Sequence, residues 1–127
     1  MDVDASPPRE PPASLYEARQ GLALFLNRFG HTMTLGEFQK LIRDKYYETD
    51  RARGAPGTYL WFVEEVGELA HAIANRERGK LDQANLEEEF ADVIAWLATL
   101  ANICDVDLTK AVHDKYLKDG GPEGFKV

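Results

Sequence analysis

Two pairs of acidic residues carry the clearest chemical pattern in this sequence of 127 residues. Glu65 and Glu68 lie three positions apart in WFVEEVGELAHAI, and Glu89 and Asp92 lie three apart in NLEEEFADVIAWL. Residues at this spacing are neighbours on a helix surface. If two such helices pack side by side, each pair of like charges about 5 Å apart costs roughly 3 kcal/mol at an effective dielectric near 20. The pattern therefore predicts a divalent cation, and oxygen ligands without Cys or His favour Mg²⁺, with Mn²⁺ as the substitute, over zinc.

Two tryptophans accompany these acids. On a helical wheel Trp61 shares a stripe with the first acidic pair, and Trp96 shares a stripe with the second. Trp61 precedes its pair by one turn and Trp96 follows its pair by one turn, so antiparallel packing places both indoles at the same end of the cluster. Stacking on an aromatic side chain contributes about 1–3 kcal/mol per base. This end is a candidate nucleobase site, while packing in a subunit interface would explain the same pattern.

Four helices are predicted to position these residues. Thr34 and Glu37 form a capping box that opens the first helix, and Asp107 is the predicted cap of the last. The segment RARGAPGT interrupts the pattern between the first two helices. The sequence has no alternating β pattern, so the predicted fold is all-α, an antiparallel four-helix bundle. The four predicted ranges are 35–47, 58–76, 85–102 (with Asn85 as cap and Glu88 as its partner) and 107–118, and a short N-terminal helix is expected within SLYEARQGLALFLNRFG.

The expected core lies on one apolar face of each central helix, with the carboxylates at its flank. On the second helix these residues are Phe62, Val63, Val66, Leu69, Ala70 and Ile73, and on the third they are Leu86, Phe90, Val93, Ile94, Leu97 and Ala101. The predicted domain organisation is a disordered, proline-rich tail over 1–13, a single helical domain over 14–120 with its core at 33–118, and a C-terminal tail over 121–127.

Charge and composition exclude several functions. The 15 Lys and Arg against 22 Asp and Glu give a net charge of −7, which argues against sequence-independent binding to nucleic acid. No apolar run is long enough to span a bilayer and the N-terminus is unlike a signal peptide, so we expect no membrane contact and a cytoplasmic location. Cys104 is the only cysteine, so an intramolecular disulfide is impossible, and we expect it to be buried.

The sequence from EEVGE (Glu64 to Glu68) to EFAD (Glu89 to Asp92) resembles the EExxE…ExxD signature of the MazG-type all-α nucleoside triphosphate pyrophosphohydrolases. The similarity continues through LATLANICDVDLTKAVHDKY and covers roughly residues 33–118. The resemblance implies that Glu65, Glu68, Glu89 and Asp92 hold Mg²⁺. It also implies that a nucleoside triphosphate is cleaved between its α and β phosphates, and that the chain is a homodimer or homotetramer with active sites near subunit interfaces.

Further roles follow from the same resemblance. Glu64 would bind a second metal ion or accept a proton from the attacking water, although an exposed glutamate in helix-surface pairs explains its presence as well. Lys115 matches the family's phosphate-facing lysine in the final helix. The asparagine and arginine that family members carry after this lysine are replaced here by Lys118, Asp119 and GGPEGFKV. Contacts between substrate and the C-terminus therefore depart from the family pattern.

Three hypotheses follow for function. The first is a Mg²⁺-dependent pyrophosphohydrolase that removes non-standard or surplus (d)NTPs, with Glu64 and the four metal-binding acids as its catalytic residues and Lys115, Trp61 and Trp96 as substrate-binding residues. The second is the related phosphoribosyl-ATP pyrophosphohydrolase of histidine synthesis, which the GELAHAI segment fits less well. The third is a non-catalytic, metal-binding helical oligomer. A ferritin-like di-iron bundle is disfavoured because the sequence has no Glu-x-x-His pair.

Overall fold

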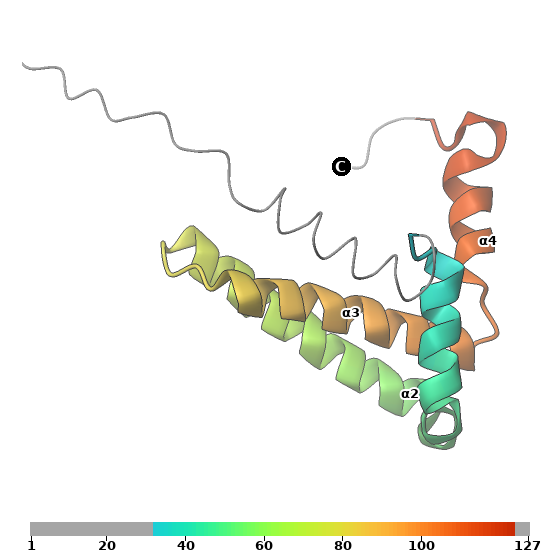
Figure 1. Cartoon of the computed structure of the whole chain (residues 1–127), viewed down its shortest axis with the longest axis horizontal. Helices are drawn as coiled ribbons and strands as arrows, with labels where there is room; N and C mark the ends of the chain where they lie inside the picture. The colour runs from blue at the N-terminus through green and yellow to red at the C-terminus, as the bar shows by residue number, and fades with distance from the viewer. Residues whose placement is uncertain (1–31, 124–127) are drawn as a thin grey trace, which may run out of the picture. The chain divides into compact units, whose positions relative to one another are not determined.

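The computed structural model of the chain describes residues 32–123, and those from Leu35 onward belong to one compact unit. Its elements are α2 (Leu35–Glu77), α3 (Gln83–Ile103), α4 (Leu108–Val112), a π-helical turn η1 (His113–Leu117) and a 3₁₀ turn η2 (Lys118–Gly120) (Figure 1). No strand occurs between residues 32 and 123, so the all-α prediction is confirmed for this part of the chain. The four-helix bundle is not confirmed, because these residues contain three α-helices. The tail over 1–13 and the short helix predicted within 14–30 lie outside the described residues.

Helix α2 consists of two arms that meet at Gly54. Gly54 has φ 77° and ψ 168°, a backbone conformation that glycine adopts without steric cost. Pro56 lies two residues later, in the first turn of the second arm, where its missing N–H costs no hydrogen bond. The interruption predicted in RARGAPGT is confirmed, but its extent was wrong. The first arm continues past Tyr47 to residue 53, and the second arm begins directly after Gly54 instead of near Thr58.

Helix α3 packs along the second arm of α2 (Figure 1). It begins earlier than predicted, because Asp82 and not Asn85 is its cap. The Asp82 backbone is extended, and its carboxylate accepts a hydrogen bond of 3.1 Å from the Asn85 backbone N–H. At the other end, the backbone N–H of Cys104 donates to Leu100. Cys104 is exposed, so its predicted burial was wrong.

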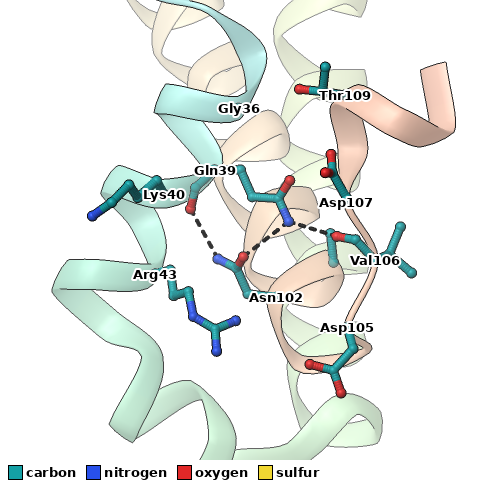
Figure 2. Close-up of a pocket in the computed structure, with 10 residues that line it drawn as sticks. Gly36, Gln39, Lys40, Arg43, Asn102, Asp105, Val106, Asp107 and Thr109 are labelled. Atoms are coloured by element: carbon teal, nitrogen blue, oxygen red, sulfur yellow. Dashed lines mark hydrogen bonds between the residues drawn. The ribbon is translucent and has the colours of Figure 1, made fainter. Parts of the chain in front are cut away.

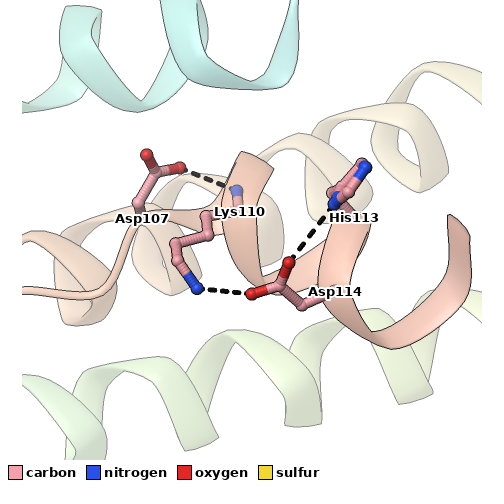
Figure 3. Close-up of polar contacts among 4 residues, drawn as sticks. All are labelled: Asp107, Lys110, His113 and Asp114. Atoms are coloured by element: carbon pink, nitrogen blue, oxygen red, sulfur yellow. Dashed lines mark hydrogen bonds and ion pairs between the residues drawn. The ribbon is translucent and has the colours of Figure 1, made fainter. Parts of the chain in front are cut away.

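Helix α4 begins where the sequence predicts. Asp107 caps it by accepting a 3.0 Å hydrogen bond from the Lys110 backbone N–H, and the Lys110 ammonium pairs with Asp114, which also contacts His113 (Figure 3). The regular α-helix ends at Val112, and the π-helical turn η1 and the 3₁₀ turn η2 follow it as far as Gly120. The helix predicted over 107–118 is therefore helical from Leu108 to Leu117, but only its first part is an α-helix.

The side chain of Gln39 ties the first arm of α2 to the turn between α3 and α4 (Figure 2). Its amide nitrogen donates to Asn102 Oδ1 at 3.1 Å and to the Val106 carbonyl at 2.7 Å, and its oxygen accepts from the Leu108 backbone N–H at 2.9 Å. The Asn102 amide returns a 3.2 Å hydrogen bond to the Gln39 carbonyl. This network holds the first arm of α2 against the C-terminal end of α3.

The helices of the unit bury only part of the predicted core, including Leu86 and Ala101. The buried positions along the second arm of α2 and along α3 are mostly small or polar: Thr58, Ala72, Leu86, Glu89, Ala98, Thr99, Ala101 and Asn102. Much of the predicted core is exposed. We call these exposed residues the apolar seam: Val63, Val66 and Ile73 on α2, with Phe90, Ile94 and Leu97 on α3. Two helices can bury only the faces that they turn to each other, and here small side chains allow the close approach. Even with this seam, no helix within residues 32–123 is long and apolar enough to cross a membrane.

Candidate functional site

Three of the predicted metal ligands meet between the second arm of α2 and α3. Glu65 comes from α2, and Glu89 and Asp92 come from α3. One carboxylate oxygen from each lies within 4.8 Å of the others. Glu89 is buried, and the other two are partly buried. Both acidic pairs therefore contribute to one cluster, as their helical spacing predicts.

Two oxygens of this cluster, Oε2 of Glu65 and Oε2 of Glu89, are buried and have no hydrogen-bond partner among residues 32–123. The second oxygen of Glu89 accepts a 2.9 Å hydrogen bond from the Asn85 side chain. A buried polar atom left unpaired costs about 1–3 kcal/mol, and more when it is charged. A divalent cation would satisfy both oxygens and relieve the repulsion among the carboxylates. The donor set, oxygen alone, fits Mg²⁺.

The electrostatics of the cluster point the same way. Burial is the main reason why the pKa of Glu65 is raised above its ordinary value, and the charges of the other three predicted ligands raise it further. A hydrogen bond from Trp96 acts in the opposite direction. The pKa of Glu68 is also raised, chiefly by the charge of Glu89. The site thus holds more negative charge than its own residues neutralise.

A pocket of about 420 Å³ opens on one side of the cluster, and we call it the acidic pocket. Glu68 lies outside the close trio and is exposed, but it lines this pocket together with Glu89. Glu64, also exposed, lines the same pocket, which places it beside the predicted metal ligands. The full lining is Glu64, Gly67, Glu68, His71, Asn85 and Glu89.

A second pocket, of about 360 Å³, adjoins the cluster through Asp92, and we call it the aromatic pocket. Its walls are mainly apolar and aromatic, with a few polar side chains, as is usual for small-molecule sites. The lining residues are Ile42, Tyr46, Asp50, Arg53, Asp92, Ala95, Trp96 and Thr99. Two members of the trio therefore line pockets of different character, Glu89 the acidic pocket and Asp92 the aromatic pocket.

The two tryptophans lie together, as the antiparallel arrangement predicts. The rings of Trp61 and Trp96 are stacked, with centroids 6.3 Å apart and an interplanar angle of 18°. At this separation the rings contact each other directly, so there is no slot for a base between them. Trp96 lines the aromatic pocket and Trp61 does not. A base in this pocket would meet Trp96, with Trp61 supporting it from behind.

The structure does not bring Lys115 to the cluster. Lys115 lies in η1, is exposed, and lines neither the acidic nor the aromatic pocket. Among residues 32–123 it forms no ion pair with any of the four predicted ligands.

Residues 56–118 match the MazG nucleotide pyrophosphohydrolase domain. The chain belongs to the MazG family. The matched residues include the four predicted ligands, Glu64, both tryptophans and Lys115, and the family name describes hydrolases that act on nucleotides. No curated protein matches the chain.

The aromatic pocket also contains residues that lie outside the MazG match. Asp50 is only 4% exposed, and it accepts hydrogen bonds of 3.2 Å from both Arg53 Nη1 and Thr99 Oγ1. The sequence pattern assigned no role to Arg53 or Thr99. The i, i+3 spacing of Asp50 and Arg53 just before the glycine was the available signal.

Proposed function

We propose that this chain is a Mg²⁺-dependent nucleoside triphosphate pyrophosphohydrolase that converts (d)NTPs to (d)NMPs and pyrophosphate and so clears non-standard or surplus nucleotides. The observation that carries the proposal is the close trio of Glu65, Glu89 and Asp92 with its two buried, unpartnered oxygens. The MazG match supports the class of reaction.

Each acidic residue has a role in this proposal. Glu65, Glu89 and Asp92 hold Mg²⁺ (or Mn²⁺ in its place), and Glu68 completes the set from the acidic pocket. The bound ion supplies neutralisation of the phosphate oxygens and activation of water. Glu64, which also lines the acidic pocket, accepts the proton of the attacking water. No protein nucleophile is needed, because positioning and charge stabilisation are the main requirements of phosphoryl transfer.

The two pockets support one orientation of the bound substrate. The nucleoside lies in the aromatic pocket against Trp96, and the phosphates run past Asp92 and Glu89 towards the acidic pocket. The aromatic walls suit a base, since base stacking is tolerant of base identity. That Lys115 binds a phosphate remains a proposal based on resemblance to the family's final-helix lysine.

We also propose that the chain works as a homodimer or homotetramer in which a second copy covers the apolar seam. The seam residues are spaced by four and three positions on α3 and by three and seven on α2, so they share one face of each helix, as in helices that pack against a partner. An exposed contiguous apolar patch is typical of an interaction site. Two copies that meet along their seams would pack four long helices together.

The test is incubation of the purified protein with Mg²⁺ and a panel of ribo-, deoxy- and modified nucleoside triphosphates, followed by chromatography of the products. We expect a monophosphate and pyrophosphate in equal amounts, and no products in EDTA. Cleavage of phosphoribosyl-ATP alone would replace the proposal with the histidine-pathway reaction. If Mg²⁺ binds but no triphosphate is cleaved with Mg²⁺ or Mn²⁺, the chain is instead a non-catalytic metal-binding oligomer.

A further inference from the structure

Arg53 occupies an unusual place beside the candidate site. Within residues 32–123, it is the only lysine or arginine that lines the acidic or the aromatic pocket. Its guanidinium lies over the Trp96 ring, 5.1 Å from the centroid. Arg53 also precedes residues 56–118, so it lies outside the segment that matches the MazG domain.

The side chain of Arg53 is held from several directions. Its Nη1 donates to Asp50 at 3.2 Å and to Thr58 Oγ1 at 3.4 Å, across the bend of α2. Both partners are buried, and Thr58 is completely so. A Cβ atom at Gly57 would come within 3.1 Å of Arg53 Cγ, so the glycine makes room for the arginine stem. An arginine fixed in this way is preorganised to bind.

Part of the guanidinium remains available to a ligand. All of the hydrogen bonds that Arg53 forms with residues 32–123 use Nη1. A guanidinium has five N–H donors in a planar fork, so Nη2 and Nε keep donors that no residue in this range satisfies. The Arg53 side chain is 26% exposed and lines the aromatic pocket, where a bound molecule can accept from these donors.

The walls of the aromatic pocket indicate what that molecule is. Ile42, Tyr46, Ala95 and Trp96 suit a flat, partly apolar ring better than a phosphate chain. In the proposed function the phosphates lie at the carboxylates, which would hold a metal ion. Arg53 is therefore placed to meet the edge of a base.

We propose that Arg53 selects the substrate base by donating two N–H groups to adjacent acceptors on the base edge, an inference that rests on the proposed function for its substrate class. Guanine offers such a pair in O6 and N7, and arginine is its usual bidentate partner. Cytosine offers O2 and N3 on its Watson–Crick edge. Adenine, thymine and uracil place a donor beside each accessible acceptor and cannot satisfy the fork. Asp50 acts as the positioning residue by fixing the orientation of the guanidinium.

The experiment measures binding and turnover separately. Calorimetric titration with dGMP, dCMP, dAMP and dTMP, in the presence of Mg²⁺, reports base preference whether or not the chain hydrolyses triphosphates. We expect dGMP, dCMP or both to bind between about 5-fold and 150-fold more tightly than dAMP and dTMP, the range expected of a good bidentate pair. Comparison of dGMP with dCMP then distinguishes the two acceptor pairs.

Arg53→Lys keeps the charge but removes the fork, so the ratio between favoured and disfavoured bases should fall towards one. The matched control is Arg43→Lys, because Arg43 also lies over an aromatic ring (4.0 Å from the Tyr47 centroid) but lines neither pocket beside the cluster. Gly57→Ala, which pushes on the arginine stem, should lower the same ratio with Arg53 intact. Circular dichroism checks that each variant is folded.

Several outcomes would overturn the proposal. Equal binding of all four monophosphates by the wild-type chain, or no binding at all, would do so without any variant. A uniform loss across the four bases in Arg53→Lys would assign the residue to phosphate. Base-selective binding without hydrolysis of any triphosphate would support the role of Arg53 and reject the proposed function. Hydrolysis of triphosphates without base preference would support the proposed function and reject the role of Arg53.

Discussion

The two faces of the helical pair formed by α2 and α3 differ sharply. Ala98 is completely buried on the inner face, while its neighbour Leu97 is 42% exposed on the apolar seam. Similarly, Glu89 is buried and the adjacent Phe90 is exposed. Charged residues are seldom buried unless they are paired, and large apolar residues are seldom left in water in groups. Each face of the helical pair therefore lacks something that a ligand or a partner would provide.

The inner face and the apolar seam lack different things. The inner face lacks positive charge, since its carboxylates crowd together with two buried oxygens unpaired. The seam lacks a cover, and full burial of each large apolar side chain would contribute about 1.5–3 kcal/mol. The inner face should therefore respond to divalent metal and to loss of a carboxylate, and the seam should respond to protein concentration and to an inserted charge.

The largest expected effect comes from removing a carboxylate of the inner face. Glu65→Gln and Asp92→Asn should each lower kcat/KM by at least about 10³-fold, because bound metal supplies several kcal/mol of charge stabilisation in the transition state. Helix content should be unchanged, since neither substitution creates a cavity. Steady-state kinetics and circular dichroism measure the two quantities.

Glu88→Gln is the matched control for these variants. Glu88 is exposed on α3 beside Glu89 and lines neither pocket, so its activity should stay near that of the wild-type chain. If Glu65→Gln and Asp92→Asn keep as much activity as Glu88→Gln, the trio is not the catalytic metal site.

The next effect concerns the seam. Ile94→Lys should convert the oligomer to a monomer, because a charge buried in an apolar interface is strongly unfavourable. Light scattering coupled to size-exclusion chromatography gives the mass directly. Ala84→Lys serves as control, since Ala84 is exposed in the first turn of the same helix, almost three turns away from Ile94. A wild-type chain that is monomeric at high concentration, or an Ile94→Lys variant that keeps its mass, would contradict the role of the seam.

The same two faces show what the sequence could and could not predict. The convergence of the acidic pairs and of the two tryptophans followed from helical spacing, and the cap at Asp107 followed from local chemistry. The wheel separated an acidic stripe from an apolar one but could not tell which stripe faces the neighbouring helix. The assumption that apolar residues form the core of the single chain assigned Val63 and Ile94 to the interior, and both are exposed.

The bend of α2 set the other limit on prediction. Glycine and proline in RARGAPGT indicated an interruption, but periodicity does not distinguish a loop from a one-residue bend. The role of Arg53 depends on this bend, because its partners Asp50 and Thr58 lie on opposite sides of Gly54. The start of α3 at Gln83 was missed because Asp82 competes with Asn85 as a cap, and only the extended backbone at Asp82 decides between them.

The smallest expected effect is a pH dependence of stability that belongs to the inner face. Burial and neighbouring charge raise the pKa of Glu65, and the charge of Glu89 is the main cause of the raised pKa of Glu68, each relative to an ordinary value of 4.5. The folded chain therefore binds protons more tightly at these groups than the unfolded chain does. Their unfavourable contribution is fully present above the raised pKa values, and it is relieved as the pH falls through them towards 4.5.

In EDTA at about pH 7.5, the Glu65→Gln variant should therefore be more stable than the wild-type protein. As the pH falls to about 5, the melting temperature of the wild-type protein should rise relative to that of the variant. Saturating Mg²⁺ should reverse the order at the higher pH, because the ion stabilises only the chain whose carboxylates can bind it and competes with protons for them. Thermal denaturation of both proteins, with and without metal, measures all four curves. Parallel curves for the two proteins in EDTA would show that Glu65 is not under electrostatic strain, and the contrast between the two faces would then rest on the seam alone.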